Sequence, residues 1–351
     1  MGLPSSVALT VVAAMLVTFD VGPTESVGMC AARTAGAATL PLVWQGPARH
    51  DPDLDRWCRA VGPPIIVPAP SSRLVHEPPP LREIVVITWN AHVAEGRLDE
   101  LIAALRAGRF TSGEPVRHFV LLVQELYRRG LDVPPPTSGM RSAFAIKARR
   151  PDAPDAADFA QRLGLSFVYV PSMRNGADLR EDRGNAVIST EPFIAAVAAE
   201  LPLARQRRVA IGVTVKVRSG SSTMPLVAID AHLEPLSAPR TLWVFSNPRP
   251  RQLRTVLALA DSRIFGSDRP AGIVVGGDLN TIQGGTEEPA YALGRKWSRG
   301  LASEDPRPTH VMGRLDYLFF RSEAGWTLSA TRIDEKFGSD HHPVLGRFRE
   351  E

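Results

Sequence analysis

The sequence predicts a four-layer α/β sandwich, in which two central mixed β-sheets lie face to face and helices flank them. From Glu83 onward, short apolar runs bounded by turn residues alternate with helix-like segments, and the strand-like runs are the more numerous. The 351 residues and 44% hydrophobic content are ordinary for a globular protein, so a disordered or fibrous chain is excluded.

The expected strands are short runs of β-branched and aromatic residues. In chain order they are Ile84–Trp89, His118–Gln124, Ser166–Val170, Ala186–Ser189, Val209–Val217, Leu226–His232, Ile273–Gly276, Leu315–Phe320 and Trp326–Ile333. The expected helices have apolar residues at helical spacing. They are Leu98–Ala107, which Gly108 ends, Asp155–Leu163, Arg251–Ile264 and Glu288–Trp297.

Residues 1–28 contain an uncharged apolar run from Val7 to Phe19, which has the length of a signal-peptide core. No Lys or Arg precedes the run and no small-residue cleavage motif follows it, so a buried helix or a misassigned start stays open as the alternative. No apolar run reaches the roughly 18 residues that span a bilayer. We expect an exported protein, periplasmic or secreted, with this segment removed or kept as a membrane anchor.

Residues 29–82 are expected to form an N-terminal extension and a linker. Seven prolines lie between residues 62 and 80, and proline at this density predicts extended chain rather than helix or sheet. The folded domain is expected to span residues 83–351. The only cysteines, Cys30 and Cys58, precede it; they would pair in an exported chain and stay as thiols in the cytoplasm.

One long loop interrupts the folded domain. Residues 132–154 combine five prolines with Arg141, Lys147, Arg149 and Arg150. A loop of this length in a compact domain is functional or mobile. We expect a solvated insertion, and the alternative is a basic flap that faces the substrate.

The positive charge of the chain is carried almost entirely by arginine. The 41 basic and 37 acidic residues give a net charge of +4, the sequence pI is 9.4, and only four residues are lysine. Because the planar guanidinium binds phosphate at two points, this composition favours an anionic substrate. The alternative is that it reflects only the nucleotide composition of the source genome.

Polar residues stand where four expected strands stop. Asn90 follows IVVITW, Glu125 follows FVLLVQ, His232 follows LVAIDA, and Asp278 and Asn280 follow IVVGG. Strand ends hold ligands in α/β proteins, because the backbone there is rigid while the side chain leaves the core. One such residue alone is usually a cap or turn residue, whereas four strands with the same pattern indicate a site.

A second group lies near the C-terminus. Asp316 is part of RLDYLFF, and Asp340 and His341 are part of SDHHP. A carboxylate beside an imidazole holds it in one tautomer and supports its charged form, as acid–base catalysis requires. The two groups together therefore predict an active site.

Seven blocks carry a resemblance. They are TWNAH (88–92), VQE (123–125), RGNAVIS (183–189), AIDAHLEP (228–235), GGDLNT (276–281), RLDYLFF (314–320) and SDHHPV (339–344). In this order they resemble the endonuclease/exonuclease/phosphatase superfamily. Its metal-dependent phosphoesterases include deoxyribonucleases, abasic-site nucleases, neutral sphingomyelinases and inositol polyphosphate phosphatases. The resemblance covers about Glu83 to Arg349.

The resemblance implies a metal site and names its residues. Glu125 would be the principal metal ligand, Asn90 would lie beside it, and Asp340 would complete the site. Oxygen ligands suit Mg²⁺ or Mn²⁺, with Mg²⁺ as the first choice. The lack of a Cys/His cluster in the sequence argues against zinc.

The resemblance also implies the catalytic roles. Asp278 would orient or deprotonate the attacking water, and Asn280 would bind a phosphate oxygen. His341 would contact the scissile phosphate and act in acid–base catalysis, with Asp316 as its carboxylate partner. His342 would contact neither metal nor substrate.

His232 bears on the branch of the superfamily. The deoxyribonuclease, sphingomyelinase and inositol phosphatase branches usually carry Thr-His-Leu at this point, and this chain has Ala-His-Leu at residues 231–233. The histidine favours these branches over the abasic-site nucleases, and it implies that His232 binds phosphate or protonates the leaving group.

Three basic features are candidates for substrate binding. They are Arg183, Arg174 and the run 205–208, which includes Arg208. For the run, a solvated strand edge is the favoured interpretation and phosphate contact is the alternative. Arg183 is the better candidate, because it adjoins a block that lines the site in the superfamily.

The expected function is Mg²⁺-dependent phosphodiester hydrolysis, with nucleic acid as the favoured partner because a basic pI suits a polyanion. No exposed apolar aromatic hairpin is evident in the sequence. The alternatives are a sphingomyelinase-like phospholipid phosphodiesterase at a membrane surface, a phosphatase of the same superfamily, and an inactive binding module. None of the implied catalytic residues is missing, and no stable protein partner is implied.

Overall fold

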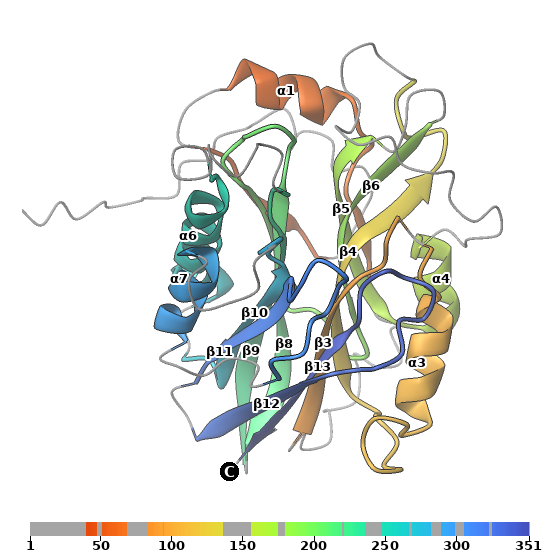
Figure 1. Cartoon of the computed structure of the whole chain (residues 1–351), viewed down its shortest axis with the longest axis vertical. Helices are drawn as coiled ribbons and strands as arrows, with labels where there is room; N and C mark the ends of the chain where they lie inside the picture. The colour runs from red at the N-terminus through yellow and green to blue at the C-terminus, as the bar shows by residue number, and fades with distance from the viewer. Residues whose placement is uncertain are drawn as a thin grey trace, which may run out of the picture.

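Two mixed β-sheets pack face to face and helices cover their outer faces, which confirms the predicted fold class (Figure 1). A computed structural model describes residues 40–47, 51–68, 83–93, 95–135, 156–174, 180–219, 221–235, 247–266, 269–281, 289–298, 305–322 and 325–350.

The first sheet has six strands. Their order is β1 (Leu42–Gln45), β7 (Ala195–Glu200), β8 (Val209–Ser219), β9 (Ser222–His232), β10 (Gly272–Asp278) and β11 (Asp316–Arg321). The second sheet has seven. Their order is β12 (Trp326–Arg332), β13 (Val344–Glu350), β3 (Glu83–Asn90), β4 (Phe119–Arg129), β6 (Glu181–Ser189), β5 (Ser166–Arg174) and β2 (Ile65–Val67). The pairs β1–β7, β9–β10 and β3–β4 are parallel, which makes both sheets mixed.

Three apolar layers hold the sandwich together. Helices α3 (Leu98–Arg106) and α4 (Ala156–Leu163) cover the outer face of the seven-stranded sheet (Figure 1). Helices α6 (Arg249–Ala260) and α7 (Pro289–Trp297) cover the outer face of the six-stranded sheet. The inner faces of both sheets share a third core of Val, Ile, Leu and Phe side chains. Because strand side chains alternate between faces, this inner layer decides which residues reach the site.

Every expected strand and helix corresponds to an observed element, with different ends. Two strands inside the expected domain had no counterpart in the prediction, β7 and β13. Strand β7 reads AAVAAE, and alanine and glutamate are depleted in strands, so its tertiary pairing with β8 overrides the local preference. A 3₁₀ turn, Arg263–Phe265, takes the place of the last turn expected for α6.

The prediction that residues 29–82 form only an extension and linker is wrong for their central part. Strand β1 pairs with β7, helix α1 (Pro52–Arg59) follows, and β2 pairs with β5 within the stretch expected to form no sheet. Strands β1 and β2 are the edge strands of the two sheets. Prolines are tolerated beside an edge strand, because one side of that strand needs no backbone donor.

The N-terminal segment expected to be a signal or anchor lies outside the described residues, as do Cys30 and residues 136–154 of the long loop. Cys58, in α1, is disulfide-bonded. Among the described residues, no helix is long and apolar enough to cross a membrane.

Candidate active site

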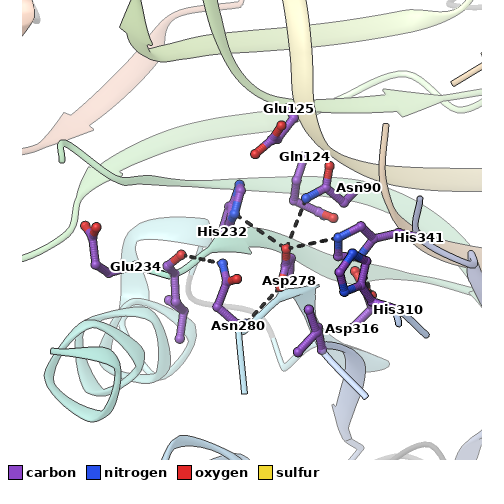
Figure 2. A network of polar contacts seen from close by, with 12 residues as sticks. Asn90, Gln124, Glu125, His232, Glu234, Asp278, Asn280, His310, Asp316 and His341 are labelled. Carbon is purple, nitrogen blue, oxygen red and sulfur yellow. Dashed lines mark hydrogen bonds and ion pairs between the residues drawn. The ribbon is translucent and has the colours of Figure 1, made fainter. Parts of the chain in front are cut away.

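The site is the polar end of the apolar layer between the sheets. On β3 the inward side chains run Ile84, Val86, Thr88, Asn90, and on β9 they run Leu226, Ala228, Asp230, His232. On β4, β10 and β11 the inward side chains likewise change from apolar to polar, at Gln124, Asp278 and Asp316 respectively. The alternation thus delivers side chains from five strands to one place (Figure 2).

A cavity of about 520 Å³ opens at this end of the layer. Its lining residues are Asn90, His92, Val93, Glu95, Glu125, Arg183, Gln206, Arg208, His232, Pro235, Asp278, Asn280, Asp340 and His341. The sequence assigned metal or catalytic roles to eight residues. Seven of them line the cavity, and the eighth, Asp316, contacts His341 from behind.

Glu125 reaches the cavity because β4 is irregular at this point. The pairing of β4 with β6 shifts register between Val123 and Leu126, and Glu125 has a φ of 55°. A bulge inserts an extra residue and re-aims a side chain, and residues other than glycine with a positive φ cluster at active sites. The Glu125 carboxylate is 3.2 Å from the Arg183 guanidinium.

Asp278 is the centre of the polar network (Figure 2). Its Oδ1 accepts a hydrogen bond from the backbone N–H of Asn280 at 2.8 Å, and its Oδ2 accepts one from Asn90 Nδ2 at 3.0 Å. The Nε2 atoms of His232 and His341 lie 3.5 and 3.9 Å from Oδ2. Burial raises the pKa of Asp278 to about 6, although the charge of His341 opposes the increase.

The backbone around Asp278 fits only particular residues. Gly277 has a φ of 148°, and a Cβ there would lie 1.7 Å from the Ala231 carbonyl oxygen on the parallel strand β9. Asn280 has a φ of 53°, a conformation that asparagine tolerates, and its side-chain amide donates to the Leu233 carbonyl. Both positions keep Asp278 close to β9 and therefore close to His232.

His341 is held as an imidazolium. Its Nδ1 is 2.8 Å from Asp316 Oδ2, and both side chains are buried. Burial alone would lower the pKa of His341, but the carboxylates of Asp316 and Asp278 raise it to about 10. Its Nε2 is therefore a proton donor that faces the cavity.

His232 has the opposite protonation state. Burial lowers the pKa of His232 well below its usual range, and the charges of Arg208 and Arg183 lower it further. The cavity thus contains a neutral imidazole, an imidazolium and a carboxylate with a raised pKa. Titratable groups whose pKa values are pushed apart are the usual arrangement of acid and base in an active site.

Asp340 lies between two histidines that had no assigned role. His310 Nε2 is 3.3 Å from Asp340 Oδ2, and His92 Nδ1 is 3.0 Å from Oδ1. Burial raises the pKa of Asp340, but the contacts with His310 and His92 lower it below its usual range. His92 lies in the TWNAH block, so the sequence did place it near the site. His310 carries no such signal, because only the fold brings it to Asp340.

A third group missed from the sequence lies beneath the cavity. Gln124 donates from Nε2 to Asp230 Oδ1 at 2.5 Å, and both side chains are buried. Burial raises the pKa of Asp230 well above its usual range.

The arginines divide into cavity residues and structural residues. Arg183 and Arg208 both line the cavity, and Arg208 is not part of a solvated strand edge. Arg208 is 3% exposed, and its guanidinium forms no ion pair with any other described residue. The prediction for Arg174 is wrong, because its side chain is 1% exposed and donates to the carbonyls of Ala60 and Pro134, away from the cavity.

The other residues of the 205–208 run do not form a solvent-exposed strand edge. Arg207 is buried in an ion pair with Glu200 and donates to the Pro171 carbonyl, while Arg205 is exposed.

His342 does not line the cavity, because its Nδ1 faces the Ile333 carbonyl oxygen at 3.0 Å.

The donor groups suit a divalent cation. The Glu125 and Asp340 carboxylates and the Asn90 amide provide oxygen ligands in one cavity, as Mg²⁺ and Mn²⁺ prefer. Asp340 Oδ1 is buried and accepts no hydrogen bond of normal geometry from the described residues. The fold also brings ligand atoms of His310, Asp340 and His341 within 4.8 Å of one another. The structure therefore contains a His-rich group of potential metal ligands that the sequence does not reveal.

Comparison with family models identifies the family of the chain. The Endonuclease/Exonuclease/phosphatase family, whose enzymes hydrolyse phosphate esters, matches residues 87–341. Comparison with curated proteins gives no match.

Solved structures that are similar to the chain have low sequence identity to it. An endonuclease/exonuclease/phosphatase from Beutenbergia cavernae is 21% identical with a TM-score of 0.52, over 77% of this chain and 72% of that one. Sphingomyelinase C from Streptomyces griseocarneus is 16% identical with a TM-score of 0.44, over 76% and 99%. TDP2 of D. rerio, complexed with a single-strand DNA product, is 16% identical with a TM-score of 0.43, over 76% and 98%. With the family match over more than half of its length, the chain belongs to the endonuclease/exonuclease/phosphatase family.

Proposed function

We propose that the protein is a Mg²⁺-dependent phosphodiester hydrolase that acts on nucleic acid. One observation carries the proposal of hydrolysis. Asp278, with a pKa of about 6, and His341, with a pKa of about 10, face each other across 3.9 Å in one cavity. At neutral pH the first can accept a proton and the second can donate one, as hydrolysis of a phosphodiester requires.

Glu125, Asp340 and Asn90 would hold the cation. When bound, a divalent cation neutralises negative charge on the phosphoryl oxygens, and Mn²⁺ can replace Mg²⁺ at an all-oxygen site. The Arg183 guanidinium, 3.2 Å from Glu125, orients that carboxylate and adds positive charge beside the phosphate.

The chain's own residues supply the proton transfers. Asp278 accepts a proton from the attacking water, whose oxygen forms the new bond to phosphorus. His341 donates a proton from Nε2 to the leaving oxygen as the old P–O bond breaks. Asp316 keeps His341 charged through the 2.8 Å contact with Nδ1. His232, neutral and 3.5 Å from Asp278, and the Asn280 amide bind phosphate oxygens.

Arg208 supports a substrate with several phosphates. A buried guanidinium without a carboxylate partner among the described residues is costly unless an anion completes it, and this one lines the cavity. Together with Arg183 and the basic pI, it favours a polyanion over a single lipid headgroup.

A phospholipid is the second candidate substrate, because one specific observation favours it. Val311 and Met312 are 87% and 47% exposed in the turn that follows His310. No exposed apolar hairpin was expected from the sequence, yet this turn places two apolar side chains beside the site. They would suit an acyl chain or a bilayer surface.

A substrate panel tests the choice. Duplex DNA, single-stranded nucleic acid, sphingomyelin, other phospholipids and inositol phosphates are offered at identical Mg²⁺, and we expect fastest turnover of a nucleic acid. Binding should weaken with salt, by a slope of about −0.9 per phosphate neutralised on duplex DNA. Arg208→Gln should reduce that slope by roughly one and raise KM, because one phosphate contact is lost.

Arg205→Gln is the matched control, since Arg205 is exposed and does not line the cavity. It should leave KM unchanged. Faster turnover of sphingomyelin than of any nucleic acid, or a reaction that salt does not affect, would assign the enzyme to the lipid substrate instead. The catalytic residues would stay as described.

A further inference from the structure

We propose that His310 is a positioning residue that fixes the Asp340 carboxylate for the cation, by donating a hydrogen bond from Nε2 to Oδ2. The inference rests on the proposed metal role of Asp340. His310 is 30 residues from Asp340 in the sequence and reaches it from the turn before β11. Neither the seven family blocks nor the strand-end pattern assigns it a role.

The backbone of the turn fixes the tautomer of His310. The backbone N–H of Met312 donates to His310 Nδ1 at 3.1 Å, so Nδ1 is an acceptor and carries no hydrogen. A neutral imidazole has one ring hydrogen, which must then be on Nε2. Nε2 is the atom that lies 3.3 Å from Asp340 Oδ2. His310 is therefore a fixed donor to this carboxylate.

The same tautomer excludes His310 as a metal ligand in this conformation. A ligating nitrogen needs a free lone pair, and Nε2 carries the hydrogen while Nδ1 accepts the Met312 N–H. The His310 ring instead packs against the His341 ring, with centroids 4.6 Å apart. Its contribution to a cation would pass through Asp340.

The turn that carries His310 is hydrogen-bonded to the backbone of the active site. His310 and Gly313 exchange two backbone hydrogen bonds, of 2.9 and 3.0 Å. The preceding Thr309 accepts the backbone N–H of Asp316 on its hydroxyl and that of His342 on its carbonyl. The turn is therefore hydrogen-bonded to the backbone of Asp316 and to that of His342, the residue after His341. The backbone that carries the His341–Asp316 pair thus also positions His310.

The two oxygens of Asp340 are left with different surroundings. Oδ2 accepts from His310, while Oδ1 accepts no hydrogen bond of normal geometry from the described residues, although His92 Nδ1 is 3.0 Å away. Fixing one carboxylate oxygen selects the rotamer and leaves the other for the cation. Such outer contacts typically change metal affinity by about 10–100-fold.

Mn²⁺ titration of the full chain, followed by electron paramagnetic resonance of free Mn²⁺, tests the proposal. His310→Leu removes the donor and should weaken Mn²⁺ binding by about 10–100-fold. His310→Gln keeps an N–H near the Nε2 position and should recover most of the affinity. His342→Leu is the matched control and should bind as the wild type does. At saturating Mn²⁺, kcat of His310→Leu should return towards the wild-type value.

Several outcomes would overturn the proposal. Wild-type affinity in His310→Leu would show that the contact does nothing for the cation. Equal loss in His310→Leu and His310→Gln would indicate that the imidazole itself binds metal. A wild type that binds no Mn²⁺ would remove the proposed metal site together with this inference, whereas the first two results would leave that site intact.

A second measurement needs no variant. Imidazole ¹H–¹⁵N correlation spectra of the wild type with Mg²⁺ should show His310 with hydrogen on Nε2 and none on Nδ1. Hydrogen on Nδ1 would contradict the proposal even if His310→Leu fails to fold.

Discussion

Replacing Asp278 with asparagine is expected to lower kcat by about 10²–10⁴-fold, because the amide cannot accept the proton of the attacking water. The fold should be preserved, and the thermal midpoint at pH 8 should be equal to or above that of the wild type. Burial raises the pKa of Asp278 above its unfolded value, so the ionised carboxylate opposes folding at pH 8 and its removal does not destabilise. Steady-state kinetics and thermal unfolding of both proteins measure the two effects.

The pH dependence provides the control for this variant. Since the carboxylate must be ionised, wild-type kcat/KM should fall as the pH drops through about 6, and this decrease should disappear from the residual activity of Asp278→Asn. A variant with wild-type kcat, or one that loses its fold along with its activity, would contradict the assigned role.

Replacing His341 with glutamine is expected to lower kcat by roughly 10² or more, while His342→Gln should be close to the wild type. His341 faces Asp278 from inside the cavity and is charged through Asp316. His342 bonds to the Ile333 carbonyl outside the cavity lining. The two histidines are neighbours in the chain, so each variant serves as the control for the other.

Asp316→Asn extends the comparison of the imidazoles. Without the Asp316 charge, the pKa of His341 should fall from about 10, and the alkaline decrease in kcat should move to lower pH. Equal or reversed effects of the two histidine variants would show that the wrong imidazole had been assigned.

The polar residues at the ends of the central strands could be predicted from the sequence. The runs that end in Asn90, His232 and Asp278 are apolar and short, and the two-residue period of a strand fixes which face each side chain occupies. Glu125 is the exception, because it reaches the cavity through the irregularity in β4. Once these runs are neighbours in two facing sheets, their terminal polar residues must meet. This accounts for Asn90, His232 and Asp278 among the seven predicted metal and catalytic residues that line the cavity.

Other features depend on contacts that local patterns do not contain. Strand β7 is rich in alanine and is stabilised by its pairing with β8, and β2 lies among prolines at a sheet edge. Arg174 is a candidate for substrate binding in the sequence, yet its guanidinium donates to the carbonyls of Ala60 and Pro134. His310 reaches Asp340 only because the turn before β11 folds back onto the site.

The central claim is that the cavity around Asp278 hydrolyses phosphodiesters with a divalent cation held by oxygen ligands. Hydrolysis of bis(p-nitrophenyl) phosphate in excess chelator, and again after addition of Mg²⁺ or Mn²⁺, tests it with a generic diester, whatever the natural substrate is. We expect no turnover in chelator, recovery with either cation, and no recovery in Asp278→Asn. Full turnover of the wild type in excess chelator, or equal recovery in Asp278→Asn, would contradict the claim.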